Sequence, residues 1–338
     1  MIRKATRLAD LAAMSGLSIS TVSRALSDSP SINAQTKQRI WQLAREHGYA
    51  LRRSMPAGPE GADAVIAIIV PRPQGRDNYW LSDPFFLELF AGVGDAARQR
   101  DCDFLVSHVS PDSFEDLRQV MSTTRADGVI FLGQSHLHEA FNRLADVEDR
   151  FAVWGAQLPD QRYCCVGSDN VLGGRRAALH LARLGRRHII FLGNTEAPEA
   201  DQRRLGYLEG LTQAGLDVDP ALIVDAHFEV ESAEASVESL IHRGVTFDGV
   251  AAASDLIALG AIRALRRAGR AVPKDVSVIG YDNVPFARYS GPALSTIAQN
   301  TARAGRLLVS KLLDHQGEGA LRSERVATDL IVRESCGG

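Results

Sequence analysis

The sequence feature that most limits the fold is an alternation of short apolar runs with helical patterns, which begins at residue 64. The apolar runs have the length of buried strands, and several of the segments between them have the apolar spacing of helices. The predicted strands are 64–70, 104–109, 128–132, 151–154, 164–166, 188–192, 221–224, 249–253 and 276–279, and the predicted helices are 85–98, 171–184, 202–214, 233–242 and 256–268. Strands that alternate with helices form parallel sheets covered on both faces.

This alternation runs through two successive halves of the chain, so it predicts a body with two lobes, each a doubly wound parallel sheet. Ligands of such sheets bind beyond the carboxyl ends of the strands. Two lobes whose strand ends face each other therefore predict a ligand site in the cleft between them.

A different pattern precedes the body. Residues 7–26 hold two short helical patterns around Gly16, a residue type that tolerates the positive φ of a tight turn. Ser18 can cap the second helix, whose predicted buried side chains are Val22, Ala25 and Leu26. A third amphipathic helix follows a capping segment at 33–36 and has apolar positions at Ile40, Trp41, Leu43 and Ala44. An ordinary helical hairpin and a DNA-binding helix-turn-helix both fit this pattern.

The charge distribution favours DNA binding. Residues 1–61 carry nine basic and four acidic side chains, whereas the rest carries 29 basic and 37 acidic ones. A basic head on an acidic body is expected when only the head meets phosphate. Two prolines and two glycines between residues 56 and 61 mark a linker between the two parts.

Other classes of protein lack support in the sequence. The four cysteines include an adjacent pair in an apolar run, Cys164 and Cys165, and form no disulfide framework or metal motif. Gly92-x-Gly94-x-x-Ala97 lies inside a predicted helix and not at a strand-to-helix turn, so it predicts no dinucleotide site. No nucleophile or phosphate-loop motif occurs. We expect no enzyme, cofactor or metal, and, without an apolar run of membrane length or a signal-peptide pattern, a cytoplasmic protein.

The chain resembles the lactose-repressor/galactose-repressor (LacI/GalR) family of bacterial transcription factors. The resemblance rests on L-A-D-L-A-A-M-S-G-L-S-I-S-T-V-S-R-A-L-S in the head and on D-P-F-F-L-E-L-F-A-G-V at 83–93, D-V-S-V-I-G-Y-D-N at 275–283 and V-R-E-S at 332–335 in the body. It implies a helix-turn-helix headpiece (1–50), a hinge linker (51–63) and a bilobed body similar to periplasmic binding proteins (64–338). The first lobe would comprise about 64–165 and 297–325, and the second about 166–296 and 326–338.

The resemblance also implies roles in the head. Ile19, Ser20 and Arg24 match base-reading positions of the recognition helix, where the guanidinium could grip a guanine. Thr21 and Ser23 match phosphate contacts, and Arg7, Ser18 and Thr36 are further contacts to DNA near helix N-termini. Core packing is the alternative for Ile19.

In the body, the resemblance implies an effector pocket. Phe85, Phe86 and Leu89 match its wall on the first lobe; Arg203, Phe228, Ser254 and Asp282 match its polar and stacking groups. Sugar hydroxyls pair with Arg and Asp, and sugar rings stack on aromatics. Phe86 as a core residue and Asp282 as a turn cap are the alternatives.

The chain departs from the family pattern in three places. The leucine that wedges into the minor groove falls at Gly58 between prolines, so we expect Met55 to intercalate instead or the operator to kink less. The loop 71–83 is long, and its Tyr79 and Trp80 are either part of an insertion or an aromatic lid that would suit a disaccharide or glycoside. No heptad tail follows V-R-E-S, which predicts a homodimer and a pseudo-palindromic operator.

The sequence therefore predicts a repressor controlled by a small sugar, with release of double-stranded operator DNA on sugar binding favoured over corepression. An activator or a non-sugar effector such as a purine is the alternative, although Ala197 and Glu199, placed in a loop before the helix 202–214, add no cation for a charged base. A sugar-handling enzyme would need paired carboxylates in the cleft, which the sequence does not locate.

Overall fold

A computed structural model describes residues 8–26, 29, 31–46, 64–72, 83–124, 126–315 and 321–337. The chain divides into two compact units, residues 1–62 and residues 63–338, which are described separately below.

The first unit is a small helical domain. Its helices are α1 (Leu8–Ser15), α2 (Ile19–Leu26) and α3 (Ala34–Glu46). Gly16 has a φ of +71° at the turn, and the Ser18 hydroxyl accepts a hydrogen bond of 3.1 Å from the Thr21 amide, as an N-cap does. The three helices share one core, made by Leu11, Ala12, Val22, Ala25, Leu26, Ile40 and Ala44. The predicted helix-turn-helix is confirmed.

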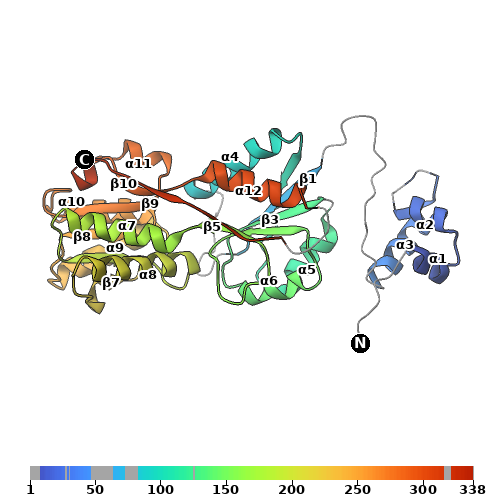
Figure 1. The fold of residues 1–338 in the computed structure, drawn as a ribbon, viewed down its shortest axis with the longest axis horizontal. Helices are drawn as coiled ribbons and strands as arrows, with labels where there is room; N and C mark the ends of the chain where they lie inside the picture. Colours follow the sequence, from blue (N-terminus) through green and yellow to red (C-terminus); the bar gives the residue numbers. More distant parts are fainter. Residues whose placement is uncertain are drawn as a thin grey trace. The chain divides into compact units, whose positions relative to one another are not determined.

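The second unit contains two six-stranded sheets. The first has the strand order β11-β5-β4-β3-β1-β2, and its strands are β1 (Val65–Ile69), β2 (Asp103–Val106), β3 (Gly128–Leu132), β4 (Phe151–Trp154), β5 (Cys165–Ser168) and β11 (Glu324–Val326). Its helices are α4 (Pro84–Arg98), α5 (Phe114–Thr123), α6 (His138–Ala145) and α12 (Thr301–Leu313). Figure 1 shows α4 and α12 on one face of this sheet and α5 and α6 on the other.

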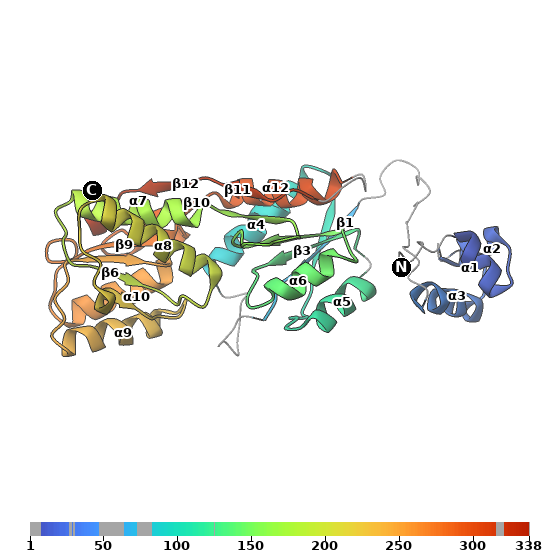
Figure 2. The same ribbon diagram turned by 60° about the horizontal axis from the view of Figure 1, so that its bottom comes forward.

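The second sheet has the order β12-β10-β9-β8-β6-β7. Its strands are β6 (Ile189–Leu192), β7 (Ile223–Val224), β8 (Gly249–Ala252), β9 (Ser277–Asp282), β10 (Ser295–Gln299) and β12 (Thr328–Ile331). Its helices are α7 (Asn170–Arg183), α8 (Pro198–Gln213), α9 (Val230–His242), α10 (Asp255–Arg267) and α11 (Pro285–Tyr289). In Figure 2, α7 and α8 cover one face and α9 and α10 the other. All described strand pairs are parallel except β10 with β12, so the predicted doubly wound sheets are confirmed.

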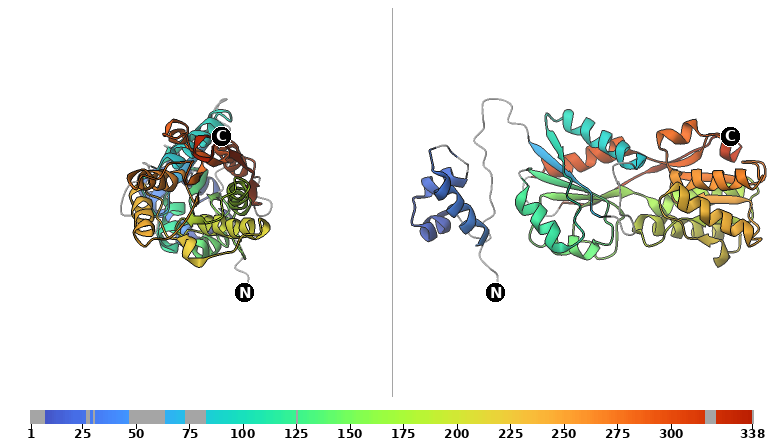
Figure 3. Two further views of the ribbon diagram at one scale, coloured as in Figure 1. Left: turned by 90° about the vertical axis from the view of Figure 1, so that its left-hand side faces the viewer. Right: turned by 180° about the vertical axis from the view of Figure 1, so that it is seen from behind.

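The chain passes between the two lobes three times, and Figure 3 shows both lobes from behind. The passages lie between β5 and α7, between β10 and α12, and between β11 and β12. Two of them are hydrogen-bonded to each other, because the Asp169 amide donates to the carbonyl of Val326 over 3.0 Å. Three adjacent connections of this kind form the joint about which two lobes can change their relative orientation.

Glycines allow the closest helix contacts of the body. A Cβ on Gly206 of α8 would lie 1.9 Å from the carbonyl oxygen of Val171 in α7. A Cβ on Gly92 of α4 would lie 2.4 Å from the carbonyl oxygen of Thr301 in α12. Gly92 therefore serves helix packing, in agreement with the prediction that its glycine motif is not a nucleotide loop.

Three local predictions need correction. The predicted strand 221–224 is mostly not a strand, because Pro220–Leu222 form a short 3-10 helix and β7 contains only Ile223 and Val224. The predicted strand 104–109 is shorter, and β2 is an edge strand with all four residues exposed and not a buried strand. The predicted helix 202–214 begins earlier, at Pro198, because proline is favoured in the first turn, where its missing amide proton is not needed. Glu199 consequently lies in a helix and not in a loop.

Candidate functional site

The head presents the outer face of α2 as its candidate DNA-binding surface. Ile19 is 52% exposed, which contradicts the alternative that it packs in the core. Ser20, Ser23 and Arg24 are exposed too, and Thr21 is half-buried. The recognition helix is thus attached by Val22, Ala25 and Leu26, and it presents hydroxyls and one guanidinium on its exposed face, where they can meet base edges and phosphates.

The remaining predicted DNA contacts differ in position. Ser18 is exposed and caps α2 through the hydrogen bond that its hydroxyl accepts from the Thr21 amide. The same hydroxyl lies 2.9 Å from that of Ser20 and 2.8 Å from that of Thr21. The amide of Thr36 donates to Asn33 Oδ1 over 2.7 Å at the start of α3, which confirms the predicted cap there. Arg7 and Met55, like the hinge as a whole, lie outside the described residues.

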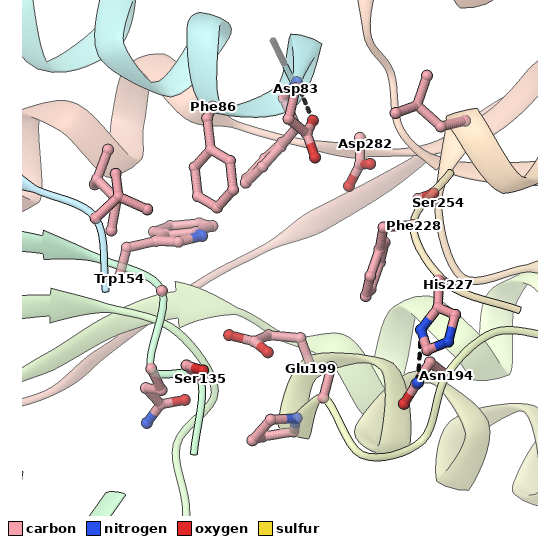
Figure 4. A pocket seen from close by; sticks show the side chains of 18 of the residues that line it. Asp83, Phe86, Ser135, Trp154, Asn194, Glu199, His227, Phe228, Ser254 and Asp282 are labelled. Atoms are coloured by element: carbon pink, nitrogen blue, oxygen red, sulfur yellow. Dashed lines mark hydrogen bonds between the residues drawn. The ribbon is translucent and has the colours of Figure 1, made fainter. Parts of the chain in front are cut away.

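A cavity of about 180 Å³ lies between the two lobes of the body, and residues of both sheets line it (Figure 4). It lies where the strands end. Trp154 closes β4, Asp282 closes β9, and Ser254 follows β8 and caps α10. This is the position expected for a ligand of doubly wound sheets.

Six predicted effector residues line the cavity: Phe85, Phe86, Arg203, Phe228, Ser254 and Asp282. Leu89 does not. It lies one turn further along α4, is fully buried, and packs in the core of the first lobe, so its predicted place on the wall was wrong. Tyr79 and Trp80 lie outside the described residues.

Arg203 is held by several groups at once. Its Nε donates to Asn170 Oδ1 over 2.9 Å, and its Nη1 donates to the carbonyl of Ala253 over 2.5 Å. Its guanidinium carbon stands 3.8 Å from the ring centroid of Tyr281, and Nη1 lies 3.9 Å from Asp282 Oδ1. Only 5% of Arg203 is exposed. The arginine is therefore oriented before any ligand arrives, which lowers the entropy cost of binding.

Asp282 is strained and withdrawn from water. Its φ is +115° and that of Asn283 is +61°, two conformations that non-glycine residues rarely adopt. Burial raises the pKa of Asp282 well above its ordinary value, although Arg203 opposes the shift. Gln299 Nε2 donates to Asp282 Oδ1 over 2.6 Å and holds the carboxylate in place.

A second buried carboxylate supports the loop that carries Asp282. Asp255 accepts hydrogen bonds from Thr296 Oγ1 over 2.6 Å and from the amide of Val284 over 2.8 Å. Burial raises the pKa of Asp255 to about 7. Asp255 does not line the cavity, so its role is to hold the 282–284 turn.

Several lining residues of the cavity were not predicted from the sequence. Four of them end a strand or lie just beyond one: Trp154, Ser135, Asn194 and His227. Ligands of doubly wound sheets bind beyond the carboxyl ends of the strands, so these positions could have been predicted. Glu199 was assigned to a loop because the start of α8 was predicted too late.

The described residues hold no group of three or more His, Cys, Asp or Glu side chains arranged for a metal. Across the same part of the chain, no helix is long and apolar enough to span a membrane. The four cysteines form no disulfide and are buried, and burial raises the pKa of Cys164 to about 11, so they act as small apolar side chains.

Both units of the chain match known protein families. Residues 7–50 match the family model "Bacterial regulatory proteins, lacI family", and residues 178–336 match a periplasmic binding protein-like domain. The HTH-type transcriptional regulator CelR of Thermobifida fusca is 30% identical over 98% of this chain and 99% of its own.

Solved structures show the same fold. A complex of the transcriptional regulator CelR with cellobiose has a TM-score of 0.70 at 28% identity and covers 98% of this chain and 99% of that one. The lac repressor dimer, bound to operator and the anti-inducer ONPF, has a TM-score of 0.71 at 21% identity over 98% of this chain and 99% of that one. With its helix-turn-helix head and bilobed body, this chain belongs to the LacI family of DNA-binding transcriptional regulators, which are not enzymes.

Proposed function

We propose that the chain is a dimeric repressor whose affinity for a pseudo-palindromic operator is controlled by a small sugar bound in the interlobe cavity. The observation that carries the proposal is the cavity, which combines aromatic faces with hydrogen-bonding side chains from both lobes. Sugars need both kinds of group, because their rings stack on aromatics while their hydroxyls require polar partners. The similarity to CelR, whose complex contains cellobiose, supports this class of effector.

The control would act through the joint between the lobes. Gln299, at the end of β10, accepts from the Ser168 hydroxyl over 2.5 Å and donates to Asp282 over 2.6 Å. Ser168 ends β5, so these hydrogen bonds connect a cavity carboxylate to two of the three passages between the lobes. A sugar that prefers one orientation of the lobes would then set the spacing of two heads.

A second copy of the chain would cover an apolar surface of the body. The edge strand β2 exposes Phe104, Leu105 and Val106 by 43%, 40% and 45%, and α4 beside it exposes Leu87 by 50%. In the second lobe, α11 exposes Phe286 by 60% and Tyr289 by 80%. Exposed apolar edge strands promote association unless a partner covers them.

A thermal-shift screen of mono- and disaccharides tests the proposal, repeated with an operator found by selection from random duplexes. A sugar that binds should raise the melting temperature, and under induction it should also weaken operator binding at a fixed salt concentration. Stabilisation by purines and by no sugar would contradict the proposal. Sedimentation should show a dimer that Leu105→Arg dissociates, whereas Val147→Arg, a change at a 70% exposed site outside this surface, should leave it intact.

A further inference from the structure

The cavity is lined by more acidic than basic side chains. Among its described lining residues, Asp83, Glu196, Glu199 and Asp282 are acidic and Arg203 is the single arginine or lysine. Arg203 is already committed to Asn170, to the Ala253 carbonyl and to Asp282. Its Nε and Nη1 are therefore already used when a ligand or a further carboxylate approaches.

Glu199 is a lining carboxylate that lies beyond ion-pair distance of Arg203. It lies in the first turn of α8, where its own backbone amide and that of Ala156 stabilise its charge. None of the described lysine, arginine or histidine side chains lies within 4.0 Å of it. Figure 4 shows its carboxylate directed into the cavity, between Trp154 and Phe228. Burial raises the pKa of Glu199, and the charge of Arg203, which lies beyond ion-pair distance, opposes this shift without cancelling it.

An aromatic wall faces the same space. It consists of Phe85, Phe86 and Trp154, with ring centroids 5.7 Å apart for the two phenylalanines and 5.9 Å apart for Phe85 and Trp154. Aromatic faces attract cations, and groups of such rings recognise ammonium ligands. A carboxylate opposite an aromatic wall suits a protonated amine better than it suits a hydroxyl, because the amine can pair with the carboxylate and also form cation–π contacts with the rings.

We propose that the effector is a carbohydrate bearing a protonated amine, an amino sugar, whose ammonium group lies between Glu199 and the aromatic wall. This inference rests on the proposed function and specifies its ligand. The same arrangement disfavours phosphorylated sugars and uronic acids, because their anionic groups would face the unpaired carboxylate. Neutral disaccharides fill the same space but leave Glu199 without a cation.

The test compares ligands by isothermal titration calorimetry on the full chain, and the three disaccharides among them share one β-1,4-linked frame. The probes are the β-1,4-linked disaccharide of glucosamine, its fully N-acetylated form, cellobiose and glucose 6-phosphate, with the pH held where the amines are protonated. The free-amine disaccharide should bind at least tenfold more tightly than the acetylated form and cellobiose, and glucose 6-phosphate should not bind.

Glu199→Gln should reduce the advantage of the amine over the neutral disaccharides to less than threefold, and an unchanged far-ultraviolet circular dichroism spectrum would show that the variant is folded. Glu209→Gln is the matched control: it removes the same charge from the same helix at an exposed site and should keep the full advantage. Equal or tighter binding of neutral disaccharides would overturn the inference and leave the proposed function standing. Binding of none of these probes, nor of any sugar in the thermal-shift screen, would overturn both.

Discussion

Replacement of Arg203 by methionine tests how the cavity is built. The change removes two hydrogen bonds from a charged donor and the cation that faces Asp282, all in a site where Arg203 is 5% exposed. Hydrogen bonds to charged groups contribute about 1.5–3 kcal/mol each. Loss of one partner of a buried ion pair costs about 3–5 kcal/mol. These contributions overlap because one guanidinium makes them all, so we expect the free energy of unfolding of the body to fall by about 3–5 kcal/mol.

The loss of stability caused by Arg203→Met should depend on pH. In Arg203→Met, Asp282 remains buried without its cation, so its pKa in the folded protein lies further above that of the unfolded chain. A carboxyl group whose pKa is raised in the folded protein favours folding at pH values below its pKa in the unfolded chain. This contribution disappears as the pH rises through its pKa in the folded protein. The penalty should therefore be larger at pH 8 than at pH 5, by at most about 4 kcal/mol for one proton over three pH units.

Urea denaturation of the full chain at both pH values, followed by far-ultraviolet circular dichroism, measures this penalty. Adding Asp282→Asn to Arg203→Met should recover about 1–3 kcal/mol at pH 8, because it removes the unpaired charge. Arg204→Met is the matched control. Arg204 is more exposed and pairs with Asp201 at 2.7 Å, so its loss should cost less than about 1 kcal/mol. A penalty for Arg203→Met below 1 kcal/mol, or one that is equal at both pH values, would refute the reasoning.

Three further changes test other parts of the molecule. Ser18→Ala removes the acceptor for the Thr21 amide and should destabilise the head by about 1 kcal/mol, seen as faster amide hydrogen exchange in α2; unchanged exchange would argue against the cap. Arg24→Ala should weaken operator binding by about 1–3 kcal/mol in fluorescence anisotropy and random DNA by less, whereas an equal loss on both would assign Arg24 to phosphate. Gly206→Ala should destabilise the body by about 1–3 kcal/mol, because its Cβ would meet the Val171 carbonyl; an unchanged melting temperature would contradict the close packing of α7 and α8.

The sequence alone determined many of the local elements and the class of the protein. The strands 128–132 and 151–154 have the predicted bounds, because each is a compact apolar run flanked by polar or glycine residues. The turn of the head was equally readable, since Gly16 and Ser18 act through their own backbone and side chain. The family followed from motifs spread along nearly the whole chain, and the comparisons confirm it.

Only the tertiary structure decided which side chains meet in the cavity. Phe86 and Leu89 are three residues apart on one helix, yet Phe86 lines the cavity and Leu89 packs in the core. Such a choice depends on how α4 is rotated against its sheet and against the other lobe, which are long-range contacts that the local pattern does not encode. The exposed edge strand β2 is a further case, because apolar alternation reports strand formation but not whether a neighbouring strand exists.

Glu199 shows the same division most clearly. The sequence shows that residue 199 is a glutamate, but it does not show where its side chain lies or which groups surround it. Because α8 starts at Pro198 and Trp154 lies on the opposite lobe, this carboxylate faces the cavity opposite an aromatic ring. The Nε and Nη1 of Arg203 are bound to other groups, so Glu199 has no ion pair within 4.0 Å. Those relations join segments that are distant in sequence, because a site between two lobes exists only after both sheets have formed and packed.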